Sequence, residues 1–162
     1  MGPVKPEILV VPMRAAHIPA LAEIERLCFS IPWKARMLEE ELENPAAVFV
    51  VALQNGAPAG YAGMLAVCGE GDIQNVAVHP ACRRRGVATA LLGYLDRYAR
   101  THGFSRLTLE VRVSNAGAVR LYERAGFVRR GVRPGFYARP PEDALVMARL
   151  YGHSTCDKEN PD

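Results

Sequence analysis

Arginine and glycine residues gather where an apolar run gives way to a helical pattern. The segment 83–86 reads RRRG, and the residues after it begin the most regular amphipathic pattern in the chain. Backbone N–H groups at the start of a helix lie at the positive end of its dipole. Gly86 lets a ligand approach the backbone closely, and the small Ala88 and Thr89 extend that access into the first turn. This pattern predicts a site for a phosphate or a diphosphate.

The charge of this segment also favours an anionic ligand. Each cation near a helix N-terminus is unfavourable by roughly 0.3–1 kcal/mol, so three arginines there require an anionic counterpart. The sequence has no GxxxxGK[ST] loop and no GxGxxG after a strand, which argues against a nucleoside triphosphate and a dinucleotide. A solvated arginine cluster is one alternative. RNA binding is a weaker one, because the run is short and lacks interleaved aromatic residues.

Hydrophobic periodicity predicts the elements that must hold this segment in place. Helical spacing covers residues 16–27, 34–42, 86–102 and 116–125. Alternating or continuous apolar runs predict strands at 8–13, 48–54, 58–68, 73–78, 107–113, 127–132 and 144–150. Asn55-Gly56 and the turn at 69–72 (GEGD) make strands two to four an antiparallel meander. The stretch 135–141 (GFYARPP) is expected to be a loop between the last two strands.

Composition bounds the class of protein. With 162 residues, 49% of them hydrophobic, the chain is long enough for one domain with a substantial core. Its elements predict an α/β domain with a single mixed sheet. The apolar runs are shorter than the roughly 20 residues that cross a bilayer, and the N-terminus lacks the layout of a secretory signal. We therefore expect no membrane association and a cytoplasmic location, with a net charge of +3 that favours anionic ligands.

Cysteine and histidine residues predict neither disulfides nor a metal site. The four cysteines are far apart, and no histidine stands at zinc-ligand spacing from any of them. We expect free thiols, and we expect Cys82 to be a bystander, although the neighbouring arginines could make it reactive. The sequence contains no GxSxG elbow, the motif that would suggest a covalent intermediate. The residues concerned are Cys28, Cys68, Cys82, Cys156, His17, His79, His102 and His153.

Two longer motifs carry a family resemblance. The run NVAVHPACRRRGVATALL (75–92) resembles the acetyl-coenzyme A motif Q/R-x-x-G-x-G/A of the GNAT acetyltransferases, with Arg83, Gly86 and Ala88 in the motif positions. The run LEVRVSNAGAVRLYERAGF (109–127) is similar to the second half of the same family's core. Together with FSIPW (29–33) and GFYARPPEDALVMARL (135–150), these runs resemble the ribosomal-protein-alanine N-acetyltransferases, the RimI type. The resemblance covers roughly residues 8–150.

The resemblance implies a fold, a domain and an activity. The fold would be a GNAT-like single domain over residues 1–151, with a mixed, mainly antiparallel sheet of about seven strands and helices on both faces. Residues 152–162 would be a polar, disordered tail. The chain would transfer an acetyl group from acetyl-coenzyme A to the N-terminal α-amino group of a protein, most plausibly the N-terminal alanine of a small-subunit ribosomal protein. We expect no metal and no direct nucleic-acid partner.

The resemblance also implies roles for individual residues. Glu110 would be the general base, acting directly or through water, and Tyr122 the acid that protonates the leaving thiolate. Backbone N–H groups of Val76, Ala77 and Val78 would stabilise the oxyanion. The coenzyme would contact these three residues together with Arg83, Arg84, Arg85, Gly86, Val87, Ala88, Thr89 and Asn115. The acceptor would contact Trp33 and Tyr137.

Plainer interpretations of the same residues stay open at this point. Glu110 could be a strand carboxylate that faces solvent or pairs with Arg112. Asn115 could be an N-cap, and Tyr122 a half-buried aromatic with its hydroxyl in water. The acceptor could instead be a lysine or a small amine such as an antibiotic or a polyamine. The chain could also be a coenzyme A-binding module without turnover, although such a module would need neither Glu110 nor Tyr122.

Overall fold

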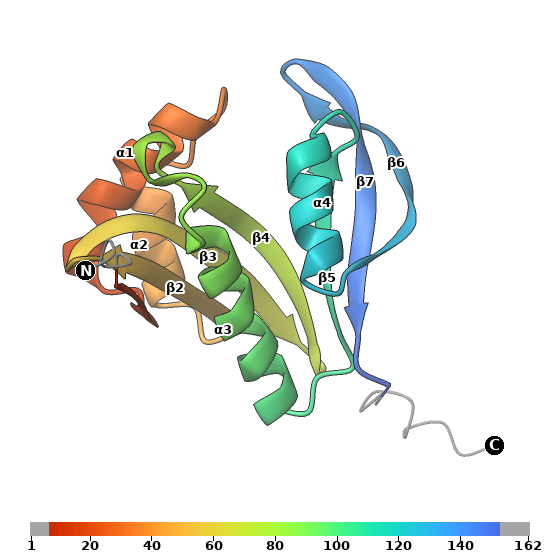
Figure 1. Cartoon of the computed structure of the whole chain (residues 1–162), viewed down its shortest axis with the longest axis horizontal. Helices are drawn as coiled ribbons and strands as arrows, with labels where there is room; N and C mark the ends of the chain where they lie inside the picture. Colours follow the sequence, from red (N-terminus) through yellow and green to blue (C-terminus); the bar gives the residue numbers. More distant parts are fainter. Residues whose placement is uncertain (1–6, 153–162) are drawn as a thin grey trace, which may run out of the picture. The chain divides into compact units, whose positions relative to one another are not determined.

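The computed structural model describes residues 7–152 and contains seven strands and four α-helices. The helices are α1 (Ile18–Cys28), α2 (Ala35–Leu42), α3 (Val87–Thr101) and α4 (Ala116–Arg124), with short 3₁₀ turns at Ala15–His17 and Pro80–Cys82. The strands are β1 (Ile8–Pro12), β2 (Ala47–Gln54), β3 (Ala57–Val67), β4 (Glu70–Val78), β5 (Arg106–Arg112), β6 (Val128–Ala138) and β7 (Pro141–Leu150). Figure 1 shows these elements along the chain.

The strands form one mixed sheet in the order β1-β2-β3-β4-β5-β7-β6. Antiparallel pairing joins β1 to β2, β5 to β7 and β6 to β7, whereas β4 pairs with β5 in parallel through Glu70↔Arg106, Gly71↔Leu107 and Asp72↔Thr108. The predicted α/β fold with one mixed sheet of seven strands is confirmed.

The chain packs as two compact units, which we describe separately. The first contains residues 7–63 and 75–94, and the second contains residues 64–74 and 95–152. In the first unit a core cluster lies between α1, α2 and the strands, and Leu21, Leu38, Val51 and Tyr61 are fully buried in it. In the second unit Leu107 and Met147 are similarly buried on β5 and β7.

One predicted turn and one predicted loop are shorter in the structure than the sequence suggests. The turn after β3 consists of Cys68 and Gly69, both with positive φ, so that Gly71 lies within β4. A Cβ on Gly71 would come within 2.6 Å of the Leu107 side chain, so the glycine is there for close packing. The predicted loop at 135–141 is also shorter, because β6 continues to Ala138 and β7 begins at Pro141. A register shift between Arg133 and Tyr137 accommodates the intervening Pro134 and Gly135 within the strand.

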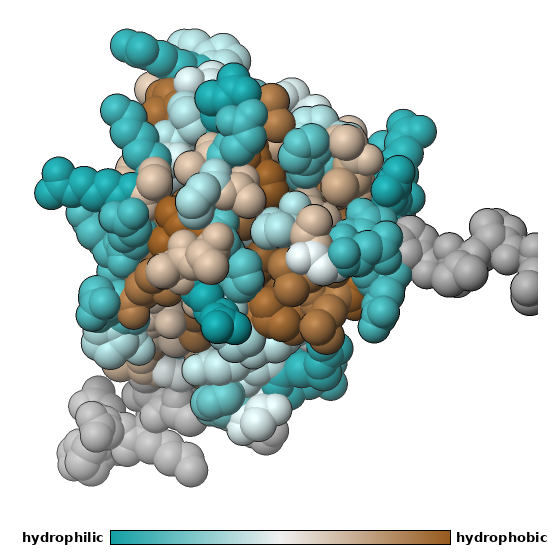
Figure 2. Space-filling view, turned by 90° about the vertical axis from the view of Figure 1, so that its left-hand side faces the viewer, coloured by the Kyte–Doolittle hydropathy of each residue, from teal (hydrophilic) through white to brown (hydrophobic). Residues whose placement is uncertain are grey.

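Several large apolar side chains remain exposed. On the α1 to α2 side of the first unit they are Leu27, Phe29, Ile31, Met37 and Leu42. Figure 2 shows hydrophobic side chains, in brown, lying between polar ones on one face of the molecule. None of the helices described between residues 7 and 152 is both long and apolar enough to cross a membrane.

Candidate active site

The predicted anion-binding segment lies in the first unit, between β4 and α3. Arg84 and Gly86 have positive φ angles of 63° and 82°, and α3 begins directly after them at Val87. The first hydrogen bond of the helix runs from the Ala90 N–H to the Gly86 carbonyl at 3.0 Å. The N–H groups of residues 87–89 therefore have no partner within the helix and are available to a ligand.

The side chains of this segment are available as well. Residues 83–86 are all exposed, and within the described part of the chain neither Arg84 nor Arg85 forms an ion pair. Arg83 donates to the Cys28 sulfur at 3.5 Å. A Cβ on Gly86 would meet nothing within 4 Å, so the glycine is required by its backbone angle and not by space. Free amides and guanidinium groups together fit a diphosphate.

The end of β4 carries the predicted oxyanion donors, Val76, Ala77 and Val78. Ala77 is buried, and the Val78 carbonyl accepts a hydrogen bond from the Cys28 thiol at 3.3 Å. A Cβ on Gly60 would lie 2.7 Å from the Ala77 carbonyl oxygen and 3.0 Å from Val87 Cγ1. Gly60 thus allows β3 to lie close to both this strand and the first residue of α3. The sequence analysis missed Gly60, because no local motif marks it.

Trp33, one of two predicted acceptor contacts, is also in the first unit. Its ring packs against Phe49 with centroids 6.1 Å apart, and its backbone N–H donates to the Glu25 carboxylate at 3.1 Å. Glu25 is buried inside α1, and the sequence analysis did not single it out. A single glutamate on the apolar face of the predicted helix is the sequence signal that could have identified Glu25 as a buried carboxylate.

Glu110, the predicted general base, lies on β5 in the second unit. Its carboxylate forms an ion pair with Arg133 of β6, with Nη1 and Oε1 3.0 Å apart. The alternative of a pair with Arg112 is wrong, because Arg112 instead bonds Glu142 at 3.2 Å, whereas the Glu110 side chain does reach solvent, with 20% of it exposed. The sequence analysis missed Arg133, which is 23 residues away from Glu110.

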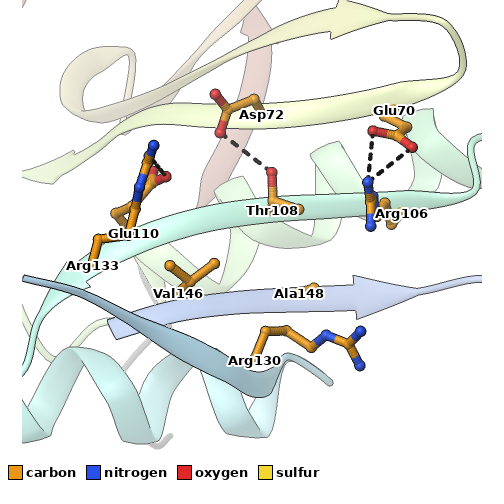
Figure 3. A pocket seen from close by; sticks show the side chains of 9 residues that line it. All are labelled: Glu70, Asp72, Arg106, Thr108, Glu110, Arg130, Arg133, Val146 and Ala148. Carbon is orange, nitrogen blue, oxygen red and sulfur yellow. Dashed lines mark hydrogen bonds and ion pairs between the residues drawn. The ribbon is translucent and has the colours of Figure 1, made fainter. Parts of the chain in front are cut away.

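Glu110 and Arg133 line an open pocket of about 480 Å³ in the second unit. Figure 3 shows the charged groups of this pocket: Glu110 meets Arg133, Glu70 meets Arg106, and Asp72 meets Thr108, above Val146 and Ala148 of β7. A second, smaller pocket of about 320 Å³ shares Asp72, Glu110 and Arg133 and adds the aromatic pair Phe136 and Tyr137. The predicted base thus lines both a charged hollow and a partly aromatic one.

Tyr122, the predicted acid, lies on α4 and is buried rather than half-buried, with 9% of its surface exposed. Burial, reinforced by repulsion from the Tyr137 phenol, raises the pKa of Tyr122 to about 12. The phenol is therefore protonated throughout the neutral range and holds a proton that it can donate. Its ring packs edge-on against Phe127, with centroids 5.9 Å apart.

Tyr137, the second predicted acceptor contact, lies on β6. Burial raises the pKa of its phenol, while the nearby Arg112 guanidinium, 4.2 Å from the ring centroid, opposes that rise. Arg112 also donates to the carbonyls of Arg139 and Pro140 at 3.0 and 2.9 Å. Arg112 thereby stabilises the turn between β6 and β7 and also contacts the Tyr137 ring. Its place in the LEVR motif did not indicate this role.

Asn115 has the capping role that the sequence predicted. Its side-chain oxygen accepts from the Ala118 N–H at 3.2 Å and thereby caps α4. The predicted helix end is also confirmed, because Gly126 has a φ of 95° directly after the last turn. A coenzyme contact by Asn115 stays a prediction.

The predicted site residues divide between the two units. The first unit holds Trp33, the end of β4 and the segment 83–89, and the second holds Glu110, Asn115, Tyr122 and Tyr137. Between residues 7 and 152, no group of His, Cys, Asp or Glu side chains could hold a metal ion. Cys28 and Cys82 are free thiols, whereas Cys156, His153 and the predicted tail beyond Gly152 lie outside the described residues.

Comparison with known proteins places this geometry in a family. Residues 18–127 match the acetyltransferase (GNAT) family. The chain is 33% identical over 138 residues to the [ribosomal protein bS18]-alanine N-acetyltransferase of Escherichia coli (strain K12), covering 84% of this chain and 93% of that enzyme. It is 37% identical over 136 residues to a Bacillus subtilis (strain 168) protein that is provisionally assigned the same activity, covering 83% and 90% of the two chains.

Structural comparison agrees with the sequence comparison. The crystal structure of the ribosomal-protein-S18-alanine N-acetyltransferase from Escherichia coli superposes with a TM-score of 0.83 at 30% identity, covering 96% of this chain and 99% of that one. The chain therefore belongs to the GNAT family of acetyltransferases. It is an acetyl-coenzyme A-dependent N-acetyltransferase, related to the [ribosomal protein bS18]-alanine N-acetyltransferases.

Proposed function

We propose that this chain acetylates the N-terminal α-amino group of a protein, and that its acceptor is the N-terminal alanine of a small-subunit ribosomal protein. The observation that carries this proposal is the match to the Escherichia coli enzyme over 93% of that enzyme's length. A match over 84% of this chain includes the anion-binding segment wherever in the chain it begins.

Glu110 removes a proton from the acceptor ammonium group, either directly or through water. An α-amino group titrates near 7.7–8.0, against about 10.4 for a lysine side chain, so a carboxylate base suffices for this acceptor at neutral pH. The ion pair with Arg133 orients the Glu110 carboxylate before the acceptor arrives.

Tyr122 supplies the proton that the leaving thiolate requires. Its buried, neutral phenol supports this role, because an acid that is already ionised cannot donate. Backbone N–H groups of Val76 to Val78 stabilise the oxyanion, a contribution that is typically worth a few kcal/mol. The amides of residues 87–89, with Arg84 and Arg85, bind the diphosphate of acetyl-coenzyme A.

Three peptides test the proposed acceptor. The purified chain is incubated with acetyl-coenzyme A and a peptide that begins with a free alanine, the same peptide with a blocked N-terminus, or a blocked peptide that contains lysine. We expect mass spectrometry to find acetylation of the free N-terminus alone. Acetylation confined to lysine or to small amines would refute the proposed acceptor. The Glu110→Gln variant should lose turnover and still bind coenzyme A.

A further inference from the structure

A carboxylate lies buried in the first unit and has no part in the mechanism described so far. Glu25, in the last turn of α1, is 1% exposed. It accepts hydrogen bonds from the Tyr61 hydroxyl, from Asn75 Nδ2 at 2.9 Å, and from the Trp33 backbone N–H at 3.1 Å. A buried carboxylate is tolerated only with such partners, so all three donors matter to it.

The three donors come from two different kinds of structure. Tyr61 and Asn75 belong to β3 and β4, and they also bond each other at 2.9 Å, so this side of the cluster is a closed network within the sheet. Trp33 belongs to the irregular segment that connects α1 to α2. Glu25 therefore links the segment between α1 and α2 to the hydrogen-bonded side chains of β3 and β4.

Glu25 holds both ends of that segment, residues 29–33. Its backbone carbonyl accepts from the Phe29 N–H at 3.0 Å, and its side chain accepts from the Trp33 N–H. Between these two anchors, Phe29 and Ile31 are 41% and 60% exposed. Large apolar side chains on a segment that is pinned at both ends are typical of a recognition surface, because a pinned segment loses little entropy on binding.

We propose that Glu25 is a positioning residue for the acceptor amine: it fixes the segment 29–33 so that its apolar side chains contact the first residues of the acceptor. This inference rests on the proposed function, in which Trp33 contacts the acceptor. Of the bonds made by the Glu25 side chain, only the one to Trp33 acts on the segment, whereas the bonds to Tyr61 and Asn75 act on the sheet. This division makes the inference testable against a purely structural role.

Three variants separate the two roles. Glu25→Ala removes the acceptor of the Trp33 N–H. Glu25→Gln keeps that acceptor, and once the Asn75 side-chain amide rotates by 180° its new amide can donate to Asn75 Oδ1, which has no partner among the described residues. Tyr61→Phe disturbs the same buried cluster but leaves the Trp33 bond intact. It is the matched control for a general loss of stability.

The measurement is the KM for the acceptor peptide and, separately, the KM for acetyl-coenzyme A. We expect Glu25→Ala to raise the acceptor KM by on the order of tenfold, since a buried N–H without a partner is costly, while the KM for acetyl-coenzyme A changes less than about twofold. Glu25→Gln should restore the acceptor KM to within about threefold of the native value. Equal rises in both KM values, or an equal rise in the acceptor KM for Tyr61→Phe, would overturn the inference.

Tryptophan fluorescence tests the same idea without turnover. Trp33 is the single tryptophan of the chain, so its emission reports on this segment alone. Glu25→Ala should shift the emission to the red and increase quenching by acrylamide, whereas Tyr61→Phe should change neither. Unchanged emission in Glu25→Ala would overturn the inference. If Glu25→Ala does not fold, the double variant E25M/Y61F removes the same hydrogen-bond acceptor and puts apolar groups of similar size in its place. The same fluorescence results then support or overturn the inference.

The assay of the native chain tells a failure of the proposed function from a failure of this inference. A native chain that acetylates only lysine refutes the proposed function before any variant is made. The variants are then measured with the lysine acceptor. A selective rise in its KM supports positioning by Glu25, and an unselective rise refutes it.

Discussion

Replacing Tyr122 by phenylalanine tests the predicted acid with the least disturbance of packing. The substitution removes the hydroxyl and keeps the ring that packs on Phe127. General acid catalysis contributes typically 10²–10⁴-fold, so kcat should fall by about that factor. Binding of coenzyme A should be unchanged, because Tyr122 contributes no group to the anion-binding segment.

The raised pKa of Tyr122 sets the pH range of this effect. Burial moves the pKa from 10.0 to about 12, and a shift of this size favours the neutral phenol by roughly 3 kcal/mol. At pH 10 an ordinary tyrosine is half ionised, but only about one Tyr122 phenol in a hundred would be. The native rate should therefore show no loss from Tyr122 ionisation between pH 7 and 10.

The same shift affects stability, and its sign is fixed. The unfolded phenol ionises near its ordinary pKa of 10, whereas the native phenol stays neutral until about pH 12. The stabilisation is thus complete below pH 10 and is lost as the pH rises from there toward 12. Urea unfolding at pH 9 and pH 11 should show a steeper loss of stability for the native chain than for Tyr122→Phe.

The control for Tyr122→Phe is Tyr151→Phe. Tyr151 also has a raised pKa, caused first by burial and then by its hydrogen bond to Asp96 at 2.6 Å, but it is not among the predicted site residues. Its loss should leave kcat within about twofold of the native value. The assay is steady-state transfer to the alanine peptide at saturating acetyl-coenzyme A. A kcat for Tyr122→Phe within threefold of the native value would refute Tyr122 as the acid.

Three further substitutions and one control, Gly117→Ala, probe the frame of the site. Gly86→Ala should raise the dissociation constant of coenzyme A in calorimetry and cost about 1–2 kcal/mol of stability, because its φ of 82° strains any other residue; an unchanged constant would contradict the role of that loop. Gly60→Ala should lower kcat and destabilise the fold by about 1–3 kcal/mol, because its Cβ would lie 2.7 Å from the Ala77 carbonyl oxygen. Gly117→Ala is the control: it has open space around it and should raise the melting temperature slightly. Glu142→Gln should reduce the loss of folding stability at acid pH. Hydrogen bonds from Ser114 and Arg112 lower the pKa of Glu142 below 4.5, so its stabilisation is present above that pH and is lost as the pH falls through the native pKa. Urea unfolding of both chains at pH 7 and pH 4 would detect the difference.

Local patterns predicted most of the elements. The amphipathic stretch after Gly86 is α3, and α4, capped by Asn115, ends at Arg124, within one residue of the predicted helix 116–125. Capping and periodicity depend on neighbours in the sequence, so they can be predicted without knowledge of the fold. The same holds for the anion-binding segment, whose chemistry needs only a helix start, a glycine and basic side chains.

Glycine and proline misled the prediction where tertiary packing decides. Gly71 suggested a turn, but it lies in β4 because the Leu107 side chain occupies the place of a Cβ. Gly135 and the prolines that follow it suggested a loop, but β6 is an edge strand that bulges between Arg133 and Tyr137. Edge strands tolerate such residues because one side of the strand has no ladder to maintain. Neither outcome is visible without the neighbouring strand.

The electrostatic partners in the site depend on strand order and register, and so the sequence could not reveal them. Arg112, two residues from Glu110, was the obvious candidate for its ion pair, but the actual partner is Arg133. Residues 110 and 112 lie on the same face of β5, yet Arg112 reaches along the sheet to Glu142 and the β6 to β7 turn. The register shift after Arg133 then turns Phe136 and Tyr137 toward the pocket that Glu110 lines. The bulge that was not predicted from the sequence thus brings Glu110, the predicted base, and Tyr137, the predicted acceptor contact, into one pocket.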